Sequence, residues 1–361
     1  MPAAVLVAYC RGGFEDEAAA DLRRIAAHAH VALDIVVERG SALVVAHGDA
    51  IEPRTWERAI LAAPPIFARC AFQGTGPVDL LPGEAATGRA DRVTPLLAAI
   101  ADVAAVAAPP WRSVWIEYPD TNEGKALSTL ARALAPRIEG ALRAAGQLAD
   151  HARRRLHAVL RDGTAAFVGT SVASTRDWPL GIARLRMPGG APSRSTLKLA
   201  EALQTFLGEQ EATLLRPGLR AVDLGAAPGG WTWQLAQRGL RVTAIDNGPL
   251  KGAVARDPLV THLREDGLRW RPRRPVDWLV CDIVEQPIRI AELVAHWLAE
   301  GFARSAIFNL KLPMKKRYDE VRRCEQRIGE ILDRAGVRHS LRIRQLYHDR
   351  EEVTAYLARV D

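Results

Sequence analysis

Val222-Asp-Leu-Gly-Ala-Ala-Pro-Gly-Gly-Trp-Thr232 is the stretch that decides the fold of this 361-residue chain. An apolar strand pattern ends at Gly225, and a helical pattern opens at the pair Gly229-Gly230. Glycines at such a turn let the backbone reverse sharply and approach a ligand closely. The N–H groups that begin the following helix then face whatever lies above the sheet. The pattern predicts a strand–turn–helix unit that binds a nucleotide-like ligand.

The spacing of the glycines narrows the class of ligand. A dinucleotide site carries G-x-G-x-x-G around a pyrophosphate, whereas this turn is G-x-x-x-G-G, and Pro228 removes one N–H donor. Asp246 follows the next strand, where an acid can accept hydrogen bonds from ribose hydroxyls. Asp266 lies at a third strand end, where it could meet an adenine amino group. We therefore predict S-adenosylmethionine (SAM) as the cofactor, and the alternative is a packing turn without a ligand.

The second half of the chain alternates between strand and helix patterns. The strand-like segments are residues 219–224, 240–245, 278–281, 306–310, 340–346 and 353–360, and the helix-like segments are residues 195–207, 229–238, 288–300 and 318–335. This alternation predicts an α/β fold with a doubly wound sheet over residues 193–361. The last two strands leave no room for a helix between them, so we expect an antiparallel hairpin at the sheet's edge.

The first half has no such alternation. Its strand-like segments are residues 3–9, 32–46, 67–72, 111–118, 157–160 and 165–173, and its helix-like segments are residues 15–29, 92–107 and 127–145. These short elements predict a mixed α+β region. A loop rich in Pro and Gly, residues 187–193, follows it. We expect the passage between the two halves, a linker, at residues 176–192.

Two charged residues end apolar strands in the second half. Asp282 follows Trp278-Leu-Val-Cys281, and Lys311 ends Ala306-Ile-Phe-Asn-Leu-Lys, so both are expected at the ligand edge of the sheet. A lysine there could take a proton from a ribose hydroxyl if desolvation or neighbouring cations lowered its pKa, whereas a nearby carboxylate alone would raise it. Lys198 and Glu352 are expected at the same edge by topology. The alternative is that all four are ordinary surface charges.

The overall charge suits a polyanionic partner. The formal net charge is +7, and basic residues cluster at 153–155, 271–274 and 315–317. The last cluster follows Lys311 closely, which favours contact with the phosphates of a polyanionic partner over a merely solvated surface.

Several other features point to a protein of the cytoplasm. The four cysteines are scattered, the histidines show no metal-ligand spacing, and no apolar run approaches the roughly 20 residues that span a membrane. The apolar segment near residue 1 is too short for a good signal peptide, and we interpret it as a buried strand. We expect no metal, no membrane and a cytoplasmic location, and the sequence does not indicate an oligomeric state.

At this point the motifs resemble those of a known family, the Rossmann-like 2′-O-ribose RNA methyltransferases of the FtsJ type. The resemblance is closest to a bacterial branch that modifies 23S rRNA and carries a ferredoxin-like segment followed by a THUMP domain. It spans the whole chain, more loosely in the first half. The matching segments are residues 191–199, 222–232, 246–249, 263–267, 308–318 and 345–353.

The resemblance implies a role for each matching residue. Lys198, Asp282, Lys311 and Glu352 look like the family's K-D-K-E tetrad, with Lys311 as the proton acceptor for the ribose 2′-hydroxyl. The residues that would contact or surround SAM are Ser195, Ala227, Pro228, Gly229, Gly230, Asp246, Asp266 and Asp282. Glu351 could compete with Glu352, which we prefer because the family's glutamate directly precedes the apolar strand.

The resemblance also implies the domains and the substrate. It places a ferredoxin-like segment at residues 1–52 and a THUMP-like RNA-binding region at residues 53–175. The substrate implied is a cytidine of 23S rRNA, free or in a large-subunit assembly intermediate. Methylation of tRNA or another RNA, and an RNA-binding module that keeps SAM without catalysis, remain alternatives.

Overall fold

The computed structural model describes residues 4–48, 52–81, 91–173 and 178–360. The chain divides into two compact units, Met1–Ile182 and Ala183–Asp361. The expected linker spans residues 176–192, and its first two residues, like residue 175 before them, lie outside the described part. The described linker holds a short 3-10 turn, η1 (Pro179–Gly181), and has no helix or strand between that turn and Arg194.

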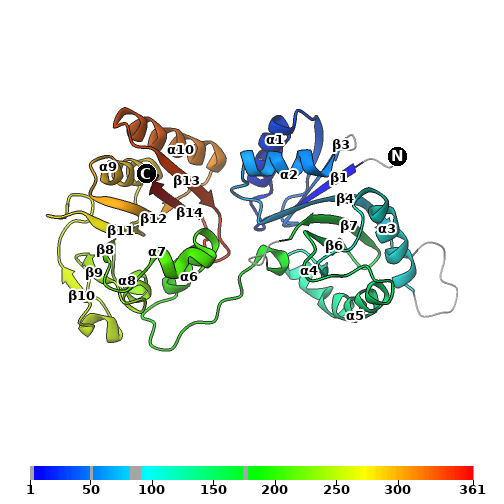
Figure 1. Cartoon of the computed structure of the whole chain (residues 1–361), viewed down its shortest axis with the longest axis horizontal. Helices are drawn as coiled ribbons and strands as arrows, with labels where there is room; N and C mark the ends of the chain where they lie inside the picture. Colours follow the sequence, from blue (N-terminus) through cyan, green and yellow to red (C-terminus); the bar gives the residue numbers. More distant parts are fainter. Residues whose placement is uncertain (1–3, 49–51, 82–90, 174–177, 361) are drawn as a thin grey trace. The chain divides into compact units, whose positions relative to one another are not determined.

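The first unit contains one seven-stranded sheet in the order β2-β3-β1-β4-β7-β6-β5, in which only β5 and β6 pair in parallel. Helices α3 and α5 pack on one face through an apolar core that includes Leu96, Ile138 and Leu156 (Figure 1). The elements are β1 (Ala4–Tyr9), α1 (Glu15–Ala29), β2 (Leu33–Val37), β3 (Leu43–Gly48), α2 (Pro53–Ala62), β4 (Cys70–Asp79), α3 (Val93–Val106), β5 (Val114–Glu117), α4 (Asn122–Ala126), α5 (Ser128–Ala144), β6 (Arg154–Leu160) and β7 (Ala165–Val172).

The predicted α+β character of this unit is confirmed, but one predicted strand is wrong, helix α2 was missed, and one strand has other bounds than expected. The single strand expected at residues 32–46 is the hairpin β2–β3, because Gly40 and Ala42 have positive φ angles of 84° and 56° and turn the chain. Helix α2 was not predicted; its side-chain cap, Glu52, accepts a hydrogen bond from Thr55 N at 2.8 Å. Strand β4 begins three residues later than expected and runs seven residues further.

The second unit contains a seven-stranded sheet in the order β10-β9-β8-β11-β12-β14-β13. The first five strands are parallel, and β14 runs antiparallel between β12 and β13. The elements are α6 (Ser195–Phe206), η2 (Gly208–Gln210), α7 (Glu211–Leu214), β8 (Arg220–Leu224), α8 (Gly230–Ala236), β9 (Arg241–Ile245), η3 (Gly252–Arg256), β10 (Val260–Leu263), β11 (Val276–Cys281), α9 (Pro287–Ala299), β12 (Ala303–Lys311), α10 (Arg317–Arg334), β13 (His339–Arg344) and β14 (Glu352–Arg359).

Helices cover both faces of this second sheet. Side chains of α6 and α8, among them Leu199, Phe206 and Leu235, share a core with Trp278 and Tyr356 of the strands, while α9 and α10 pack together on the opposite face (Figure 1). The doubly wound sheet and its antiparallel edge hairpin are thus confirmed. In such a sheet the carboxyl ends of parallel strands meet at one edge, which is where ligands bind.

Candidate active site

The Gly-rich turn joins β8 to α8 and packs against the start of α6. Gly229 has a φ of 111°, a conformation that favours glycine, and it caps α8. A Cβ added to Gly230 would overlap the side-chain oxygens of Ser193 and Ser195. The side chain of Trp231 donates from Nε1 to the carbonyl of Ser195 at 3.1 Å. Only a residue without a side chain therefore allows the turn to approach α6 this closely.

A cavity of about 230 Å³ opens above this turn. It is lined by Ser193, Ser195, Gly225, Ala226, Ala227, Pro228, Trp231 and Asp282. The lining combines a close backbone approach, two hydroxyls, an aromatic ring and one carboxylate, and it includes no Lys or Arg. This set of groups fits part of a cationic nucleoside such as SAM better than a pyrophosphate, which calls for basic or N–H-rich partners.

The other two acids predicted at the cofactor site differ in their surroundings. Asp246 follows β9 and accepts hydrogen bonds from Ala227 N at 3.0 Å and from Gly248 N at 2.7 Å, so it ties the second strand end to the turn. Asp266 lies beyond β10 with its side chain about half exposed, and it accepts a hydrogen bond from Leu268 N at 2.9 Å. Neither lines the cavity, and Asp246 is the one that contacts the turn.

Asp223, inside the turn motif, is a buried acid that the sequence reasoning did not single out. Thr232 donates from Oγ1 to one of its carboxylate oxygens at 2.6 Å, and the other oxygen has no hydrogen-bond partner among the described residues. Burial raises the pKa of Asp223 to about 7. The sequence carried a signal for this residue, because Asp223 interrupts the apolar run Ala221–Leu224 near the end of the strand.

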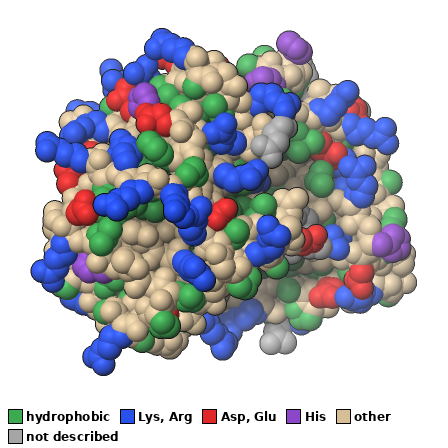
Figure 2. Space-filling view, turned by 60° about the vertical axis from the view of Figure 1, so that its left-hand side comes forward, with side chains coloured by type: hydrophobic (Ala, Val, Ile, Leu, Met, Phe, Trp, Pro, Cys, Tyr) green, Lys and Arg blue, Asp and Glu red, His purple; other side chains and the backbone are tan. Residues whose placement is uncertain are grey.

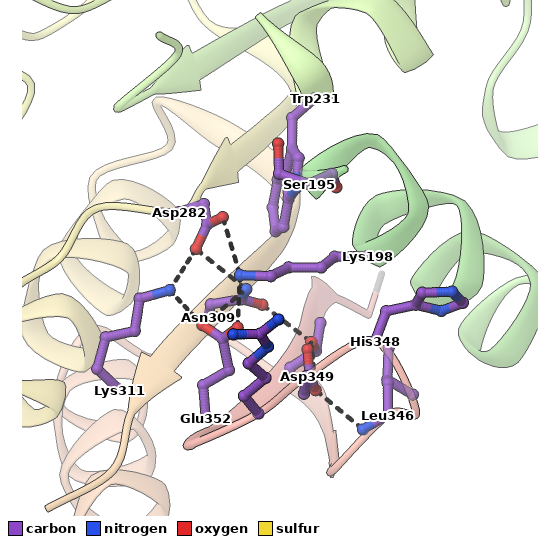
Figure 3. A network of polar contacts seen from close by, with 12 residues as sticks. Ser195, Lys198, Trp231, Asp282, Asn309, Lys311, Leu346, His348, Asp349 and Glu352 are labelled. Atoms are coloured by element: carbon purple, nitrogen blue, oxygen red, sulfur yellow. Dashed lines mark hydrogen bonds and ion pairs between the residues drawn. The ribbon is translucent and has the colours of Figure 1, made fainter. Parts of the chain in front are cut away.

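The four residues of the expected tetrad lie together (Figure 3). Lys311 Nζ donates to Asp282 Oδ1 at 2.5 Å and pairs with Glu352, and Lys198 pairs with the same two carboxylates, at 3.4 Å from Asp282 Oδ2. All four side chains are largely buried. They form a ring in which two ammonium groups alternate with two carboxylates.

The topology of the sheet explains how these residues meet. Lys311 ends β12 and lies opposite Glu352, the first residue of antiparallel β14. Asp282 directly follows β11, the parallel neighbour of β12, and Lys198 reaches the ring from α6. The register also separates the two adjacent acids, because Glu351 points away and pairs with Arg317 at 2.9 Å.

The surroundings of Lys311 determine its charge. Burial lowers the pKa of Lys311, but the attraction of Asp282 and Glu352 more than offsets this effect, so its pKa is raised above 10.5. Lys311 therefore carries its proton and a positive charge near neutral pH. To act as a proton acceptor it must first lose that proton, which requires a change in the charges around it.

Three residues that the sequence reasoning missed or left aside support the ring. Asn309, wholly buried, contacts both carboxylates of the ring. Glu201 of α6 accepts hydrogen bonds from Tyr347 N and His348 N at 2.8 and 2.9 Å, which anchors the β13–β14 loop to the helix that carries Lys198. His348 contacts Glu201 through Nδ1 and points away from the ring (Figure 3).

The basic cluster at residues 315–317 lies just beyond the ring. Lys315 and Lys316 are exposed and lie in a loop, and Arg317 begins α10. The face of the molecule drawn in Figure 2 carries more Lys and Arg than acidic side chains. Among the described residues no three His, Cys, Asp or Glu side chains are grouped to hold a metal, and no described helix is long and apolar enough to cross a membrane.

Comparison with known proteins assigns the chain to a family. The FtsJ-like methyltransferase family matches residues 191–315, the RlmM ferredoxin-like domain matches residues 3–72, and the N-terminal region of ribosomal RNA large subunit methyltransferase M matches residues 91–172. Ribosomal RNA large subunit methyltransferase M of Laribacter hongkongensis is 48% identical, covering 98% of this chain and 97% of that protein. The chain belongs to the ribosomal RNA large subunit methyltransferase M family.

A second relative of similar identity agrees with this assignment. The family member from Methylococcus capsulatus is 49% identical, covering 99% of this chain and 98% of its own length. Among solved structures, TrmN from Thermus thermophilus aligns with a TM-score of 0.38 and 16% identity over 99% of this chain and 100% of that one. Membership of the methyltransferase M family confirms the resemblance drawn from the motifs, the methyl-transfer class and SAM as the cofactor.

Proposed function

We propose that this protein transfers the methyl group of SAM to the ribose 2′-hydroxyl of a cytidine in 23S rRNA, with Lys311 as the proton acceptor. The observation that carries the proposal is the ring of Lys198, Asp282, Lys311 and Glu352 beside the cavity at the Gly-rich turn. The names of the relatives, which are ribosomal RNA large subunit methyltransferases, support an rRNA substrate. The choice of a cytidine rests on the family resemblance.

Asp282 links the cofactor site to the ring. Its side chain lines the cavity and also binds Lys311. Bound SAM supplies an electrophilic methyl group on a positively charged sulfonium. Asp282 would help to hold this cation in the cavity, and its carboxylate would then attract Lys311 less strongly, which would lower the pKa of Lys311. Lys311 could then release its proton to solvent and accept the proton of the substrate hydroxyl.

The remaining tetrad residues hold this arrangement in place. Glu352 bridges Lys311 and Lys198, so it keeps both amines at the sheet edge. Lys198 neutralises the second carboxylate and presents N–H donors toward the same edge. Most of the rate acceleration in such a site comes from holding hydroxyl, methyl donor and base in register.

Exposed residues around the ring suit an RNA nucleotide. Val284 and Met314 are 85% and 84% exposed, and they lie in the loops that follow Asp282 and Lys311 at adjacent strand ends. Apolar side chains can pack against a base that has left its stack. Lys315 and Lys316 follow Met314 and offer charge for phosphates.

Methyl transfer is tested with RNA from a strain that lacks the gene. The protein is incubated with this RNA and labelled SAM, and the modified nucleotide is mapped. The proposal expects a single 2′-O-methylcytidine in 23S rRNA. Label in tRNA, label on a base, or no label at all would contradict it. Lys311→Ala should abolish single-turnover transfer while SAM binding, measured by calorimetry, is retained.

A further inference from the structure

Asn309 lies at the centre of the tetrad but is not one of its four members. It precedes Lys311 by two residues in β12, so the two side chains share one face of the sheet. In the antiparallel pairing with β14, Thr354 lies opposite Asn309 and Glu352 lies opposite Lys311. The Asn309 side chain is fully buried between Asp282 and Glu352 (Figure 3). A buried amide needs hydrogen-bond partners for its polar atoms, so its contacts show what holds it there.

Every polar atom of the Asn309 side chain is used. Its Nδ2 donates to Asp282 Oδ1 at 3.1 Å and to Glu352 Oε2 at 3.3 Å, and its Oδ1 accepts a hydrogen bond from Thr354 Oγ1 at 2.9 Å. The opposite orientation of the amide would turn its oxygen toward two carboxylates, which is electrostatically unfavourable. The two carboxylates and the donor at Thr354 therefore fix the orientation of this amide together.

Asp349 contacts the hydroxyl of Thr354 and influences where its proton points. The Thr354 hydroxyl, which has a single proton, lies 3.0 and 2.9 Å from the two Asp349 carboxyl oxygens, one of which also accepts a hydrogen bond from Leu346 N. Burial, helped by the charges of Glu352 and Glu201, raises the pKa of Asp349 well above its usual range, so this carboxyl keeps its proton. A protonated Asp349 donates to Thr354, whose own proton is then directed to Asn309.

We propose that Asn309 is a positioning residue for methyl transfer, oriented by Thr354 and Asp349, and that its amide holds the carboxylates of Asp282 and Glu352 in place around Lys311. The chain of hydrogen bonds runs from Asp349 through Thr354 to the Asn309 oxygen, and from the Asn309 amide to both acids. This inference rests on the proposed function, because it assigns Asn309 a part in the same reaction. Asn309 itself does not touch the reacting atoms.

The test removes the orienting donor and then restores it. Thr354→Val keeps the shape of the side chain without its hydroxyl, and Thr354→Ser keeps the hydroxyl. We expect Thr354→Val to lower the single-turnover rate by about tenfold or more, since small displacements of catalytic groups cost rate steeply. The dissociation constants for SAM and RNA should stay within about twofold. Thr354→Ser should recover most of the rate, and Thr243→Val, in β9 of the same sheet, is the matched control.

The pH dependence of the rate separates positioning from general damage to the fold. Carboxylates that lose an N–H donor attract the proton of Lys311 more strongly, so Thr354→Val should move the rising part of the pH–rate profile to higher pH. A wild-type rate and profile in Thr354→Val would overturn the inference. Equal loss of rate in the Val and Ser variants, together with a matching loss of thermal stability, would also overturn it.

A failure of the proposed function is recognised separately. It would show as a wild-type protein that transfers no methyl group to 23S rRNA. The inference is then tested without the reaction, through the pKa of Lys311 measured by NMR of its ε-carbon. Thr354→Val should raise this pKa relative to wild type and to Thr243→Val, and an unchanged value would overturn the inference.

Discussion

Replacing Glu352 with glutamine tests the electrostatic account of Lys311 most directly. Asp282 and Glu352 both pair with Lys311 and raise its pKa above 10.5. At pH 7.5, an amine with a pKa of 10.5 is neutral in only about one molecule in a thousand, which corresponds to about 4 kcal/mol. Glutamine keeps the shape of the glutamate and removes its charge. Because an adjacent opposite charge shifts a pKa by about 1–3 units, Glu352→Gln should lower the pKa of Lys311 by about that amount.

The assay is the single-turnover rate of methyl transfer as a function of pH, at saturating SAM and RNA. In the wild type the rate should rise about tenfold per pH unit between about pH 6.5 and 9, since only the neutral amine accepts a proton. In Glu352→Gln this rising part should move to lower pH by about 1–3 units. Glu352 also holds Lys198, so the maximal rate should fall as well. The quantity compared is therefore the pH at which the rate stops rising, which does not depend on the maximal rate.

Glu351→Gln provides the matched control. Glu351 is the adjacent acid, its side chain is 57% exposed, and it pairs with Arg317 rather than with the ring. This variant should leave the rise where it is in the wild type. A profile of Glu352→Gln that does not move, or that moves to higher pH, would refute the assignment of Lys311 as the proton acceptor held by Glu352.

Three further predictions concern the cofactor site, stability and RNA binding. Gly230→Ala should abolish SAM binding in calorimetry, because its Cβ would overlap Ser195 Oγ, whereas Gly140→Ala in α5, with open space around it, should not; binding by Gly230→Ala would contradict the packing argument. Asp223→Asn should raise the free energy of unfolding by up to about 4 kcal/mol at pH 8.5 and by less at pH 5.5 in urea titrations. Burial raises the pKa of Asp223 from 3.8 to about 7 in the folded protein, so its charged form destabilises the fold by an amount that grows as the pH rises from 3.8 to about 7. An equal gain in the free energy of unfolding at pH 5.5 and pH 8.5 would contradict this account. Lys315→Ala should weaken RNA binding and reduce the salt slope by about 1, and an unchanged slope would exclude a phosphate contact.

The second unit could be predicted from the sequence because its strong signals are local. A parallel strand buried on both faces is a short apolar run, and the residue that follows it lies at the ligand edge, which located Asp282 and Lys311. Asn309 was missed, although a polar residue inside the apolar run Ala306–Leu310 was a visible signal. Its partners Thr354 and Asp349 come from β14 and the loop before it, and no sequence pattern specifies that pairing.

The first unit was harder to predict because its sheet is mostly antiparallel. Residues 32–46 hold two apolar runs separated by Glu38-Arg39-Gly40-Ser41. This short polar run was a visible turn signal, and the prediction of a single strand overlooked it. Strand β4 pairs with β1 on one side and β7 on the other, and it is interrupted by a register shift between Thr75 and Val78. Long-range pairing of this kind determines where a strand ends, and the strand propensity of the residues alone does not predict it.

The raised pKa of Lys311 and its proposed role as proton acceptor are reconciled by the charge balance of the ring. Two ammonium groups and two carboxylates sum to zero, which suits a largely buried site, because an unpaired charge there would carry a large desolvation cost. A positive charge bound in the cavity beside Asp282 changes that sum to +1. Loss of a proton from a lysine restores neutrality, and Lys311 is the lysine more closely paired with Asp282, at 2.5 Å against 3.4 Å for Lys198. In the proposed mechanism, the same carboxylates that keep Lys311 protonated would therefore couple its deprotonation to the binding of the methyl donor.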